Sequence, residues 1–254
     1  MARRWRNNSS DIKPNAVCQV PCVMRCAVIS GGSRGIGLAV ASELDAREWG
    51  VFLIGRHPER LAQVASSFRH LLGTFAVDLG SGEQAARETS AAVMGAVSSI
   101  DLLVLNAGIY VEDRLTTIRE EELRRIMAVN LDANLFLVRH ILPMLRKGER
   151  PRIVIVGSTA AYGAYSPAPV YGMAKWALRG LAIDLRQELK ADRIGVTFLA
   201  PGGTLTDMWE TDEVPPDRLL RPKDIGLLVA AITELSEQAV VDEIILRPMP
   251  GDVH

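Results

Sequence analysis

Tyr171 and Lys175 stand four residues apart in the run Tyr-Gly-Met-Ala-Lys, and Ser158 precedes the tyrosine by thirteen residues. A spacing of four places the phenol and the ammonium group on one face of a helix. A phenol, an ammonium group and a hydroxyl can together exchange a proton with an oxygen atom of a bound molecule. Because Tyr-x-x-x-Lys is common by chance, with a half-exposed tyrosine and a solvated lysine as its usual meaning, the interpretation depends on its surroundings.

Ser158 directly follows the apolar run 152–157, which predicts a buried strand. Ligands of open α/β proteins bind at the carboxyl ends of such strands. The position of Ser158 therefore favours a ligand-binding site that includes Tyr171 and Lys175 over a chance match to the Tyr-x-x-x-Lys pattern.

Short apolar runs alternate with longer helical patterns from Arg25 onward, which is typical of a parallel sheet covered by helices. One such pattern, within 117–146, carries Leu131, Leu135, Val138 and Leu142 at helical spacing. The sequence predicts an α/β protein with a three-layer, doubly wound Rossmann fold around a seven-stranded parallel sheet. The predicted strands are Arg25–Ser30, Val51–Gly55, Gly73–Asp78, Asp101–Asn106, Arg152–Gly157, Gly195–Ala200 and Glu243–Arg247.

A glycine-rich turn follows the first predicted strand and precedes the helical pattern Leu38–Arg47. Its glycines allow a tight turn and a close approach to a pyrophosphate, and the helix N-terminus offers free N–H groups to phosphates. A glycine turn alone can also be a simple strand-to-helix connection, but the order of strand, turn and helix favours a dinucleotide site. The predicted cofactor-binding residues of this turn are Gly31, Ser33, Arg34, Gly35, Ile36 and Gly37.

The second predicted strand ends in Gly55-Arg56-His57, without the carboxylate that binds the ribose 2′-hydroxyl of NAD. Arg56 and Arg34 can instead bind a 2′-phosphate by charge-assisted hydrogen bonds, so NADP is favoured over NAD. Each arginine taken alone is equally well an ordinary solvated charge. Weaker signals come from Asp78, which can meet the adenine, and from Asn106-Ala107-Gly108, which lets the chain pass close to the cofactor.

Taken together, these motifs resemble the short-chain dehydrogenase/reductase family over residues 24–250, in particular its NADP-preferring carbonyl and 3-oxoacyl reductases. The glycine spacing G-x-x-x-G-x-G is the form found in that family. Leu105 and Ser30 depart from the family pattern, since they stand where an asparagine and a threonine are usual. The resemblance places the catalytic tetrad on Asn130, Ser158, Tyr171 and Lys175, and adds Pro201, Gly202 and Thr206, with Tyr171 and Lys175 again, to the cofactor contacts.

The resemblance implies an NADP(H)-dependent oxidoreductase that interconverts a carbonyl and a secondary alcohol. A free tyrosine has a pKa near 10, so we expect Lys175 and the oxidised nicotinamide to make the phenol of Tyr171 more acidic. Ser158 is expected to hydrogen-bond the substrate oxygen, and Asn130 to hold a water against Lys175. An asparagine inside a helix and bonded to its backbone is the alternative for Asn130.

The chain has 254 residues, 48% of them hydrophobic, and a formal charge of −1. Mixed charge and the lack of a long apolar run give no reason to expect nucleic acid or a membrane as partner. We expect a cytoplasmic enzyme with a small-molecule carbonyl or alcohol substrate, and by resemblance a homodimer or homotetramer. Two alternatives stay open, a non-catalytic NADP-binding protein and an epimerase or dehydratase of the extended relatives.

Residues 1–23 read as a flexible N-terminal extension and 24–254 as one domain, with Met24 as an alternative start. The regularly spaced Cys18, Cys22 and Cys26 raise the question of a metal site, but Cys26 lies inside the first predicted strand, so we expect no metal. Residues 159–170 are expected to line a substrate pocket, and 207–217 to form its lid.

Overall fold

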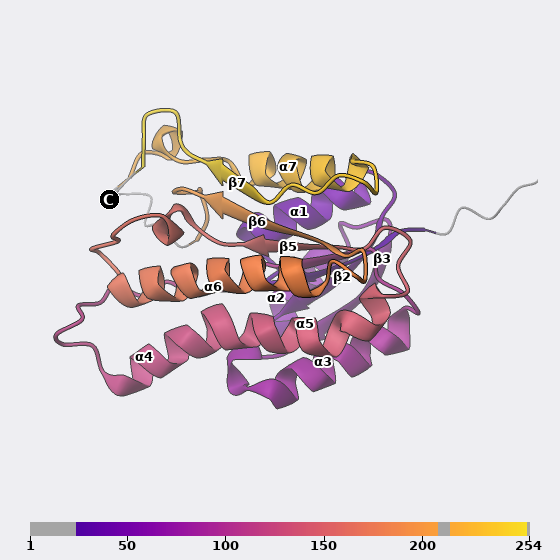
Figure 1. Cartoon of the computed structure of the whole chain (residues 1–254), viewed down its shortest axis with the longest axis horizontal. Coiled ribbons are helices and arrows are strands. Elements are labelled where there is room, and N and C mark those ends of the chain that lie inside the picture. The colour runs from indigo at the N-terminus through magenta and orange to yellow at the C-terminus, as the bar shows by residue number, and fades with distance from the viewer. Residues whose placement is uncertain (1–23, 208–213, 253–254) are drawn as a thin grey trace, which may run out of the picture.

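A seven-stranded parallel sheet forms the centre of the computed structural model, which describes residues 24–207 and 214–252 (Figure 1). The strand order is β3-β2-β1-β4-β5-β6-β7, which confirms the predicted Rossmann-type fold. The strands are β1 (Cys26–Ser30), β2 (Gly50–Gly55), β3 (Leu71–Ala76), β4 (Leu102–Leu105), β5 (Arg152–Val156), β6 (Gly195–Pro201) and β7 (Glu243–Leu246).

Every strand lies within two residues of its predicted bounds. The five inner strands are buried almost throughout, as the near-continuous runs of valine, isoleucine and leucine require. The edge strands β3 and β7 are only partly buried, because each has a neighbour on one side only. Burial also raises the pKa of the Cys26 thiol in β1 to about 12, while Cys18 and Cys22 lie outside the described residues.

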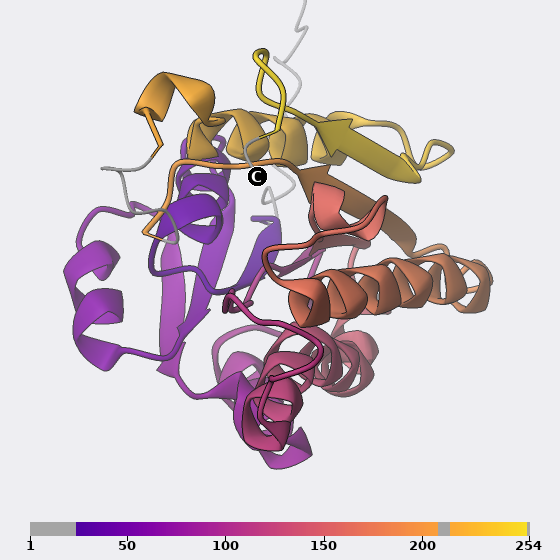
Figure 2. The same cartoon turned by 90° about the vertical axis from the view of Figure 1, so that its left-hand side faces the viewer.

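Helices cover both faces of the sheet and bury two separate apolar clusters against it (Figures 1 and 2). On one face lie α1 (Gly35–Asp45), α2 (Pro58–Ala65) and α7 (Pro222–Glu234). On the other lie α3 (Glu83–Ala96), α5 (Ala133–Leu145) and α6 (Pro169–Glu188). The short α4 (Glu120–Met127) packs through Ile126 against Val170 and Ala174 of α6.

The helical pattern predicted over 117–146 is divided in the structure. A π-helical turn, Ala128–Asp132, separates α4 from α5. Within α5 itself, Leu135, expected in the core, is 42% exposed because the face of that helix toward the sheet passes beside it. Leu137 and Ile141 fill the core instead, next to the predicted Val138.

The sheet order reverses between β1 and β4, because the chain proceeds from β1 to β2 and β3 in one direction and from β4 to β7 in the other. Such a switch point leaves a crevice at the carboxyl ends of the two strands, where ligands bind. Within residues 24–207 and 214–252, no helix is long and apolar enough to cross a membrane.

Candidate active site

A cavity of about 890 Å³ opens at the carboxyl edge of the sheet. It is lined by the turns that follow β1, β2, β4, β5 and β6, so it spans the switch point. Of the sequence-predicted site residues, all but Gly37 line this cavity. The fold therefore brings residues that are far apart in the sequence to the wall of one cavity.

The glycine turn leads directly into α1, with Arg34 as the N-cap residue. Gly35 has φ +53°, a left-handed conformation that favours glycine. Gly37 lies behind the cavity wall, where a β-carbon would collide with the carbonyl oxygen of Gly31. Gly37 is thus required for the close packing of α1 on the turn, whereas the other residues of the motif face the cavity.

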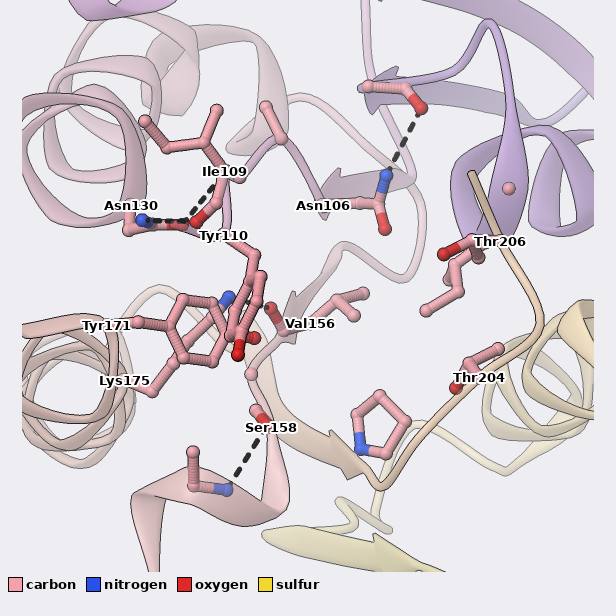
Figure 3. Close-up of a pocket in the computed structure, with 18 of the residues that line it drawn as sticks. Asn106, Ile109, Tyr110, Asn130, Val156, Ser158, Tyr171, Lys175, Thr204 and Thr206 are labelled. Carbon is pink, nitrogen blue, oxygen red and sulfur yellow. Dashed lines mark hydrogen bonds between the residues drawn. The ribbon is translucent and has the colours of Figure 1, made fainter. Parts of the chain in front are cut away.

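Ser30 joins the turn after β1 to the turn after β4. Its Oγ accepts hydrogen bonds from the backbone N–H groups of Asn106 at 2.9 Å and Ala107 at 3.0 Å. The side chain of Asn106, labelled in Figure 3, donates back to the carbonyl oxygen of Ser30 at 3.1 Å and to that of Gly31 at 3.2 Å. The serine that departs from the family pattern thus still links the two strands at the switch point.

Basic side chains gather at the end of the cavity beyond β2. Arg56 and His57 are exposed there, and Arg56 Nε lies 3.4 Å from His57 Nε2. Arg34 Nη1 donates to Asp207 Oδ2 at 2.9 Å, which the sequence did not indicate. Asp78 also lines the cavity, and its carboxylate accepts the backbone N–H of Gly80 at 2.9 Å. This end of the cavity suits an anion.

Tyr171 and Lys175 lie on one face of α6, and Ser158 follows β5, so that the three side chains meet at the cavity wall (Figure 3). The Ser158 hydroxyl is close enough to the Tyr171 phenol to lower the pKa of that phenol. Ser158 Oγ also accepts the backbone N–H of Ala160 at 3.1 Å, which fixes the serine at the start of a short 3₁₀ helix. The hydroxyl and the phenol are therefore held together next to the switch point.

Burial controls the protonation of this pair. It raises the pKa of Tyr171 to about 12, and the nearby hydroxyl of Ser158 opposes that effect. Burial lowers the pKa of Lys175 to about 8. The Lys175 ammonium nitrogen lies 5.4 Å from the centre of the Tyr171 ring and donates to the carbonyl of Val156 at 3.3 Å. The expected acidifying effect of Lys175 together with oxidised nicotinamide on the phenol stays a prediction. At neutral pH both groups keep their protons.

Asn130 lies in the π-helical turn and is fully buried. Its side-chain amide donates to the carbonyls of Ile109 at 2.9 Å and Ile126 at 3.1 Å, and its Oδ1 accepts the backbone N–H of Ile109 at 3.1 Å (Figure 3). These bonds match the alternative that the sequence left open for Asn130, a helix-interior asparagine bonded to backbone. The second lone pair of Oδ1 faces the same space as Lys175, because a β-carbon on Gly108 would lie 2.7 Å from Oδ1 and 3.7 Å from the lysine nitrogen.

Three tyrosine rings form a cluster that the sequence did not indicate. The ring centre of Tyr110 lies 5.4 Å from that of Tyr171 with the planes nearly perpendicular, and the ring centre of Tyr165 lies 5.9 Å from that of Tyr171. Tyr110 follows the turn after β4, so only the fold brings it to α6 (Figure 3). Desolvation is the largest cause that raises the pKa of the Tyr110 phenol. The cluster gives the reactive end of the cavity an aromatic wall.

The segment 159–170 contributes only part of the predicted pocket lining. Most of the segment does line the cavity, and the lining residues are Thr159, Ala160, Tyr162, Gly163, Ala164, Tyr165 and Pro167. Ala161, Ala168 and Val170 are instead buried in the protein core. They cannot line the pocket because they point away from it into the packing between elements. Of the predicted lid, 208–213 lies outside the described residues, and Asp207 and Val214 on either side line the cavity.

The sheet order, the glycine turn and the strand-end hydroxyl beside a tyrosine and a lysine define a nucleotide-dependent oxidoreductase of the α/β class. The sequence matches the short chain dehydrogenase family over residues 25–215, and the chain belongs to that family. It is therefore an enzyme of the dehydrogenase/reductase type, and the non-catalytic alternative is set aside.

Similar proteins cover nearly the same length. The chain is 29% identical over 237 residues to sepiapterin reductase of Chlorobaculum tepidum, with 89% of this chain and 97% of the relative covered. It is 32% identical over 217 residues to the 3-oxoacyl-acyl-carrier-protein reductase of Haemophilus influenzae, with 81% and 89% covered. A short chain dehydrogenase from Burkholderia cenocepacia in complex with NADP is 26% identical, with a TM-score of 0.81 and 88% and 96% of the two chains covered.

Proposed function

We propose that the protein uses NADP(H) to interconvert a carbonyl and a secondary alcohol, with Tyr171 as the acid and base. The observation that carries the proposal is that the Tyr171 phenol and the Ser158 hydroxyl share the wall of the switch-point cavity, next to Lys175. This pair stands where a substrate oxygen can receive both a proton and a hydrogen bond.

The cofactor is NADP(H), in agreement with the sequence prediction. Several similar structures, including the one from Burkholderia cenocepacia, are complexes with NADP. The cavity fits this cofactor because the glycine turn and the N-terminus of α1 can hold the pyrophosphate, while Arg34 and Arg56 stand where the 2′-phosphate is expected. When bound, NADP(H) supplies or accepts the hydride.

The chain's own residues handle the proton. In the reductive direction, the phenol of Tyr171 gives its proton to the carbonyl oxygen, which completes the alcohol once the carbon has gained a hydride. Ser158 donates a hydrogen bond to the same oxygen as negative charge develops there. The Lys175 ammonium group then stabilises the phenolate. Asn130 positions the chain at Ile109 and offers Oδ1 to a water next to Lys175.

Replacing Tyr171 by phenylalanine tests the proposal. A panel of aldehydes and ketones is first screened for NADPH oxidation with the unaltered protein. With any substrate found, we expect Tyr171→Phe to lower kcat about a hundred- to ten-thousandfold, because the proton donor is lost, and to leave NADPH affinity nearly unchanged. Tyr165→Phe is the matched control, since it removes a phenol from the neighbouring ring of the same cluster.

Two outcomes would contradict the assignment. Full turnover by Tyr171→Phe would show that another group supplies the proton. NADPH binding without turnover of any carbonyl in the panel, by the unaltered protein, would point to a different reaction at this site.

We also propose that the protein assembles as a homo-oligomer through α5 and α6. These helices carry large apolar side chains that stay exposed in the isolated chain, with exposed fractions of 42% to 53%, and such surfaces commonly mark protein contacts. The residues are Leu135, Met173, Trp176 and Ile183. Light scattering of the purified protein measures the mass, and a monomeric mass at micromolar concentration would refute this assembly.

A further inference from the structure

Asp207 joins two arginines that are far from it in the sequence. Its Oδ2 accepts a hydrogen bond from Arg34 Nη1 at 2.9 Å and another from Arg60 Nη1 at 3.3 Å. Arg34 precedes α1 in the glycine turn, Arg60 lies in α2, and Asp207 follows β6. One carboxylate oxygen therefore ties together the two elements that flank the basic end of the cavity.

The fold holds Asp207 in this place. The preceding residue, Thr206, lies directly on the glycine turn, since a β-carbon on Gly35 would be 3.0 Å from its methyl carbon. The two arginines lower the pKa of Asp207, first through the hydrogen bond from Arg34, so the carboxylate is charged at neutral pH. The three side chains are about half exposed, at 47% for Arg34, 45% for Arg60 and 57% for Asp207. An incoming ligand can thus reach all of them from solvent.

The charge at this end of the cavity is unbalanced. Arg34 and Arg56 line this end of the cavity, and Arg60 joins them through Asp207, whose single carboxylate bridges Arg34 and Arg60. Among the described residues, no second carboxylate forms an ion pair with any of these arginines. A doubly charged group that displaced Asp207 would be better matched to the three cations than the carboxylate is.

We propose that Asp207 determines cofactor selectivity by occupying, in the cofactor-free protein, the arginines that bind the 2′-phosphate of NADP(H). Arg60 then joins Arg34 and Arg56 as a third ligand of that phosphate. The inference rests on the proposed cofactor site. It adds a competitor, Asp207, and a ligand, Arg60, to that site.

Competition has a definite consequence for the two nicotinamide cofactors. A phosphate monoester carries close to two negative charges at neutral pH and three acceptor oxygens, so it can replace the carboxylate at both arginines. Binding of NADP(H) must break both bridges, whereas NAD(H) has no group that requires them to break. Asp207 therefore weakens the binding of the phosphorylated cofactor alone.

The expected size follows from the exposure of the bridges. Exposed ion pairs contribute about 0.2 to 1 kcal/mol each, so the loss of two corresponds to about a two- to thirtyfold change in a dissociation constant. The change should shrink as salt is added, because these charges are screened by the solvent.

The test is the binding of NADPH and NADH to the full chain, measured by nicotinamide fluorescence without any substrate. We expect Asp207→Asn to tighten the binding of NADPH about two- to thirtyfold at low salt and to change the binding of NADH much less. Glu59→Gln is the matched control, because it removes the same charge from an exposed position next to Arg60. Arg60→Gln should weaken the binding of NADPH and leave the binding of NADH unchanged.

The outcomes separate the inference from the proposed site. If Asp207→Asn changes both cofactors equally, matches Glu59→Gln, or weakens NADPH, Asp207 does not compete with the phosphate and the inference is wrong. If Arg34→Gln and Arg56→Gln leave the ratio of NADPH to NADH affinity unchanged, the phosphate binds elsewhere and the proposed cofactor site itself is wrong.

Discussion

Replacing Lys175 by methionine should stabilise the protein even as it removes the activity. Lys175 is only 5% exposed, and burial lowers its pKa from the ordinary 10.5 to about 8. Keeping it charged in the folded state at pH 7 therefore costs about 3 kcal/mol, since each pKa unit corresponds to about 1.4 kcal/mol. Methionine has a similar shape without the charge, but it cannot make the hydrogen bond to Val156, and this loss destabilises the variant by about 1 kcal/mol. The net gain at pH 7 is about 2 kcal/mol.

The pH dependence isolates the cost of the charge. Between pH 8 and 10.5 the unfolded chain binds a proton at Lys175 that the folded protein does not, so the stability of the unaltered protein rises with pH across this window. The cost is fully present below pH 8 and falls to about 1 kcal/mol at pH 9.5. The advantage of Lys175→Met should thus shrink by about 2 kcal/mol between pH 7 and pH 9.5. The lost hydrogen bond cancels from this difference.

Urea unfolding of both proteins at the two pH values, at equal protein concentration, measures this difference. Lys190→Met is the control, because Lys190 is exposed just beyond the end of α6 and its removal takes away a solvated charge. A stability difference between Lys175→Met and the unaltered protein that stays constant with pH would refute the reasoning, and so would a destabilised variant at pH 7.

Two further predictions concern Ser158 and Arg152. Ser158→Ala should lower kcat about a hundredfold or more with NADPH affinity unchanged, because the hydrogen bond to the substrate oxygen is lost; Thr159→Ala, the adjacent hydroxyl in the cavity wall, is its control, and equal loss in both variants would contradict the role of Ser158. Arg152→Met should lower the free energy of unfolding by about 2 to 4 kcal/mol, because the buried guanidinium donates to the carbonyls of Leu235, Ser236 and Ala239 beyond α7. Urea unfolding measures this loss, and Arg150→Met is the control, because Arg150 is exposed and its replacement should leave the free energy of unfolding almost unchanged. An Arg152→Met variant as stable as the unaltered protein would mean that water replaces the arginine.

The sheet could be predicted from the sequence because its signal is local. A strand buried on both faces needs consecutive apolar residues, and 152–156 or 102–105 show this within four or five positions. The π-helical turn at Ala128–Asp132 could not be predicted in the same way, because one extra residue in a turn leaves the apolar spacing almost helical. The error at Leu135 has another origin, because Leu135 and the buried Val138 lie in the same regular helix α5, whose core face passes through Leu137 and Ile141.

The positions of the tyrosine, lysine and serine could be predicted because their spacing is fixed by one helix and one strand end. The contacts of Tyr110 and Arg60 could not, because they depend on side chains that approach across the cavity. Arg60 and its partner Asp207 are 147 residues apart, and neither belongs to a spaced motif. The burial that raises the pKa of Tyr171 could not be predicted either, since it depends on everything packed around the phenol.

The opposite pKa shifts of Tyr171 and Lys175 have a common cause and a combined effect. Burial favours the neutral form of each group, yet with pKa values of about 12 and about 8 both groups hold their protons at pH 7. The cofactor-free site therefore contains a neutral phenol and a charged ammonium group, the pair that proton donation to a carbonyl oxygen requires. Alcohol oxidation starts instead from the phenolate, which lies about 7 kcal/mol higher at that pH because five pKa units must be overcome. In the proposed reaction, the protein alone thus prepares the acid, and formation of the base depends on the positive charge that oxidised nicotinamide adds beside the phenol.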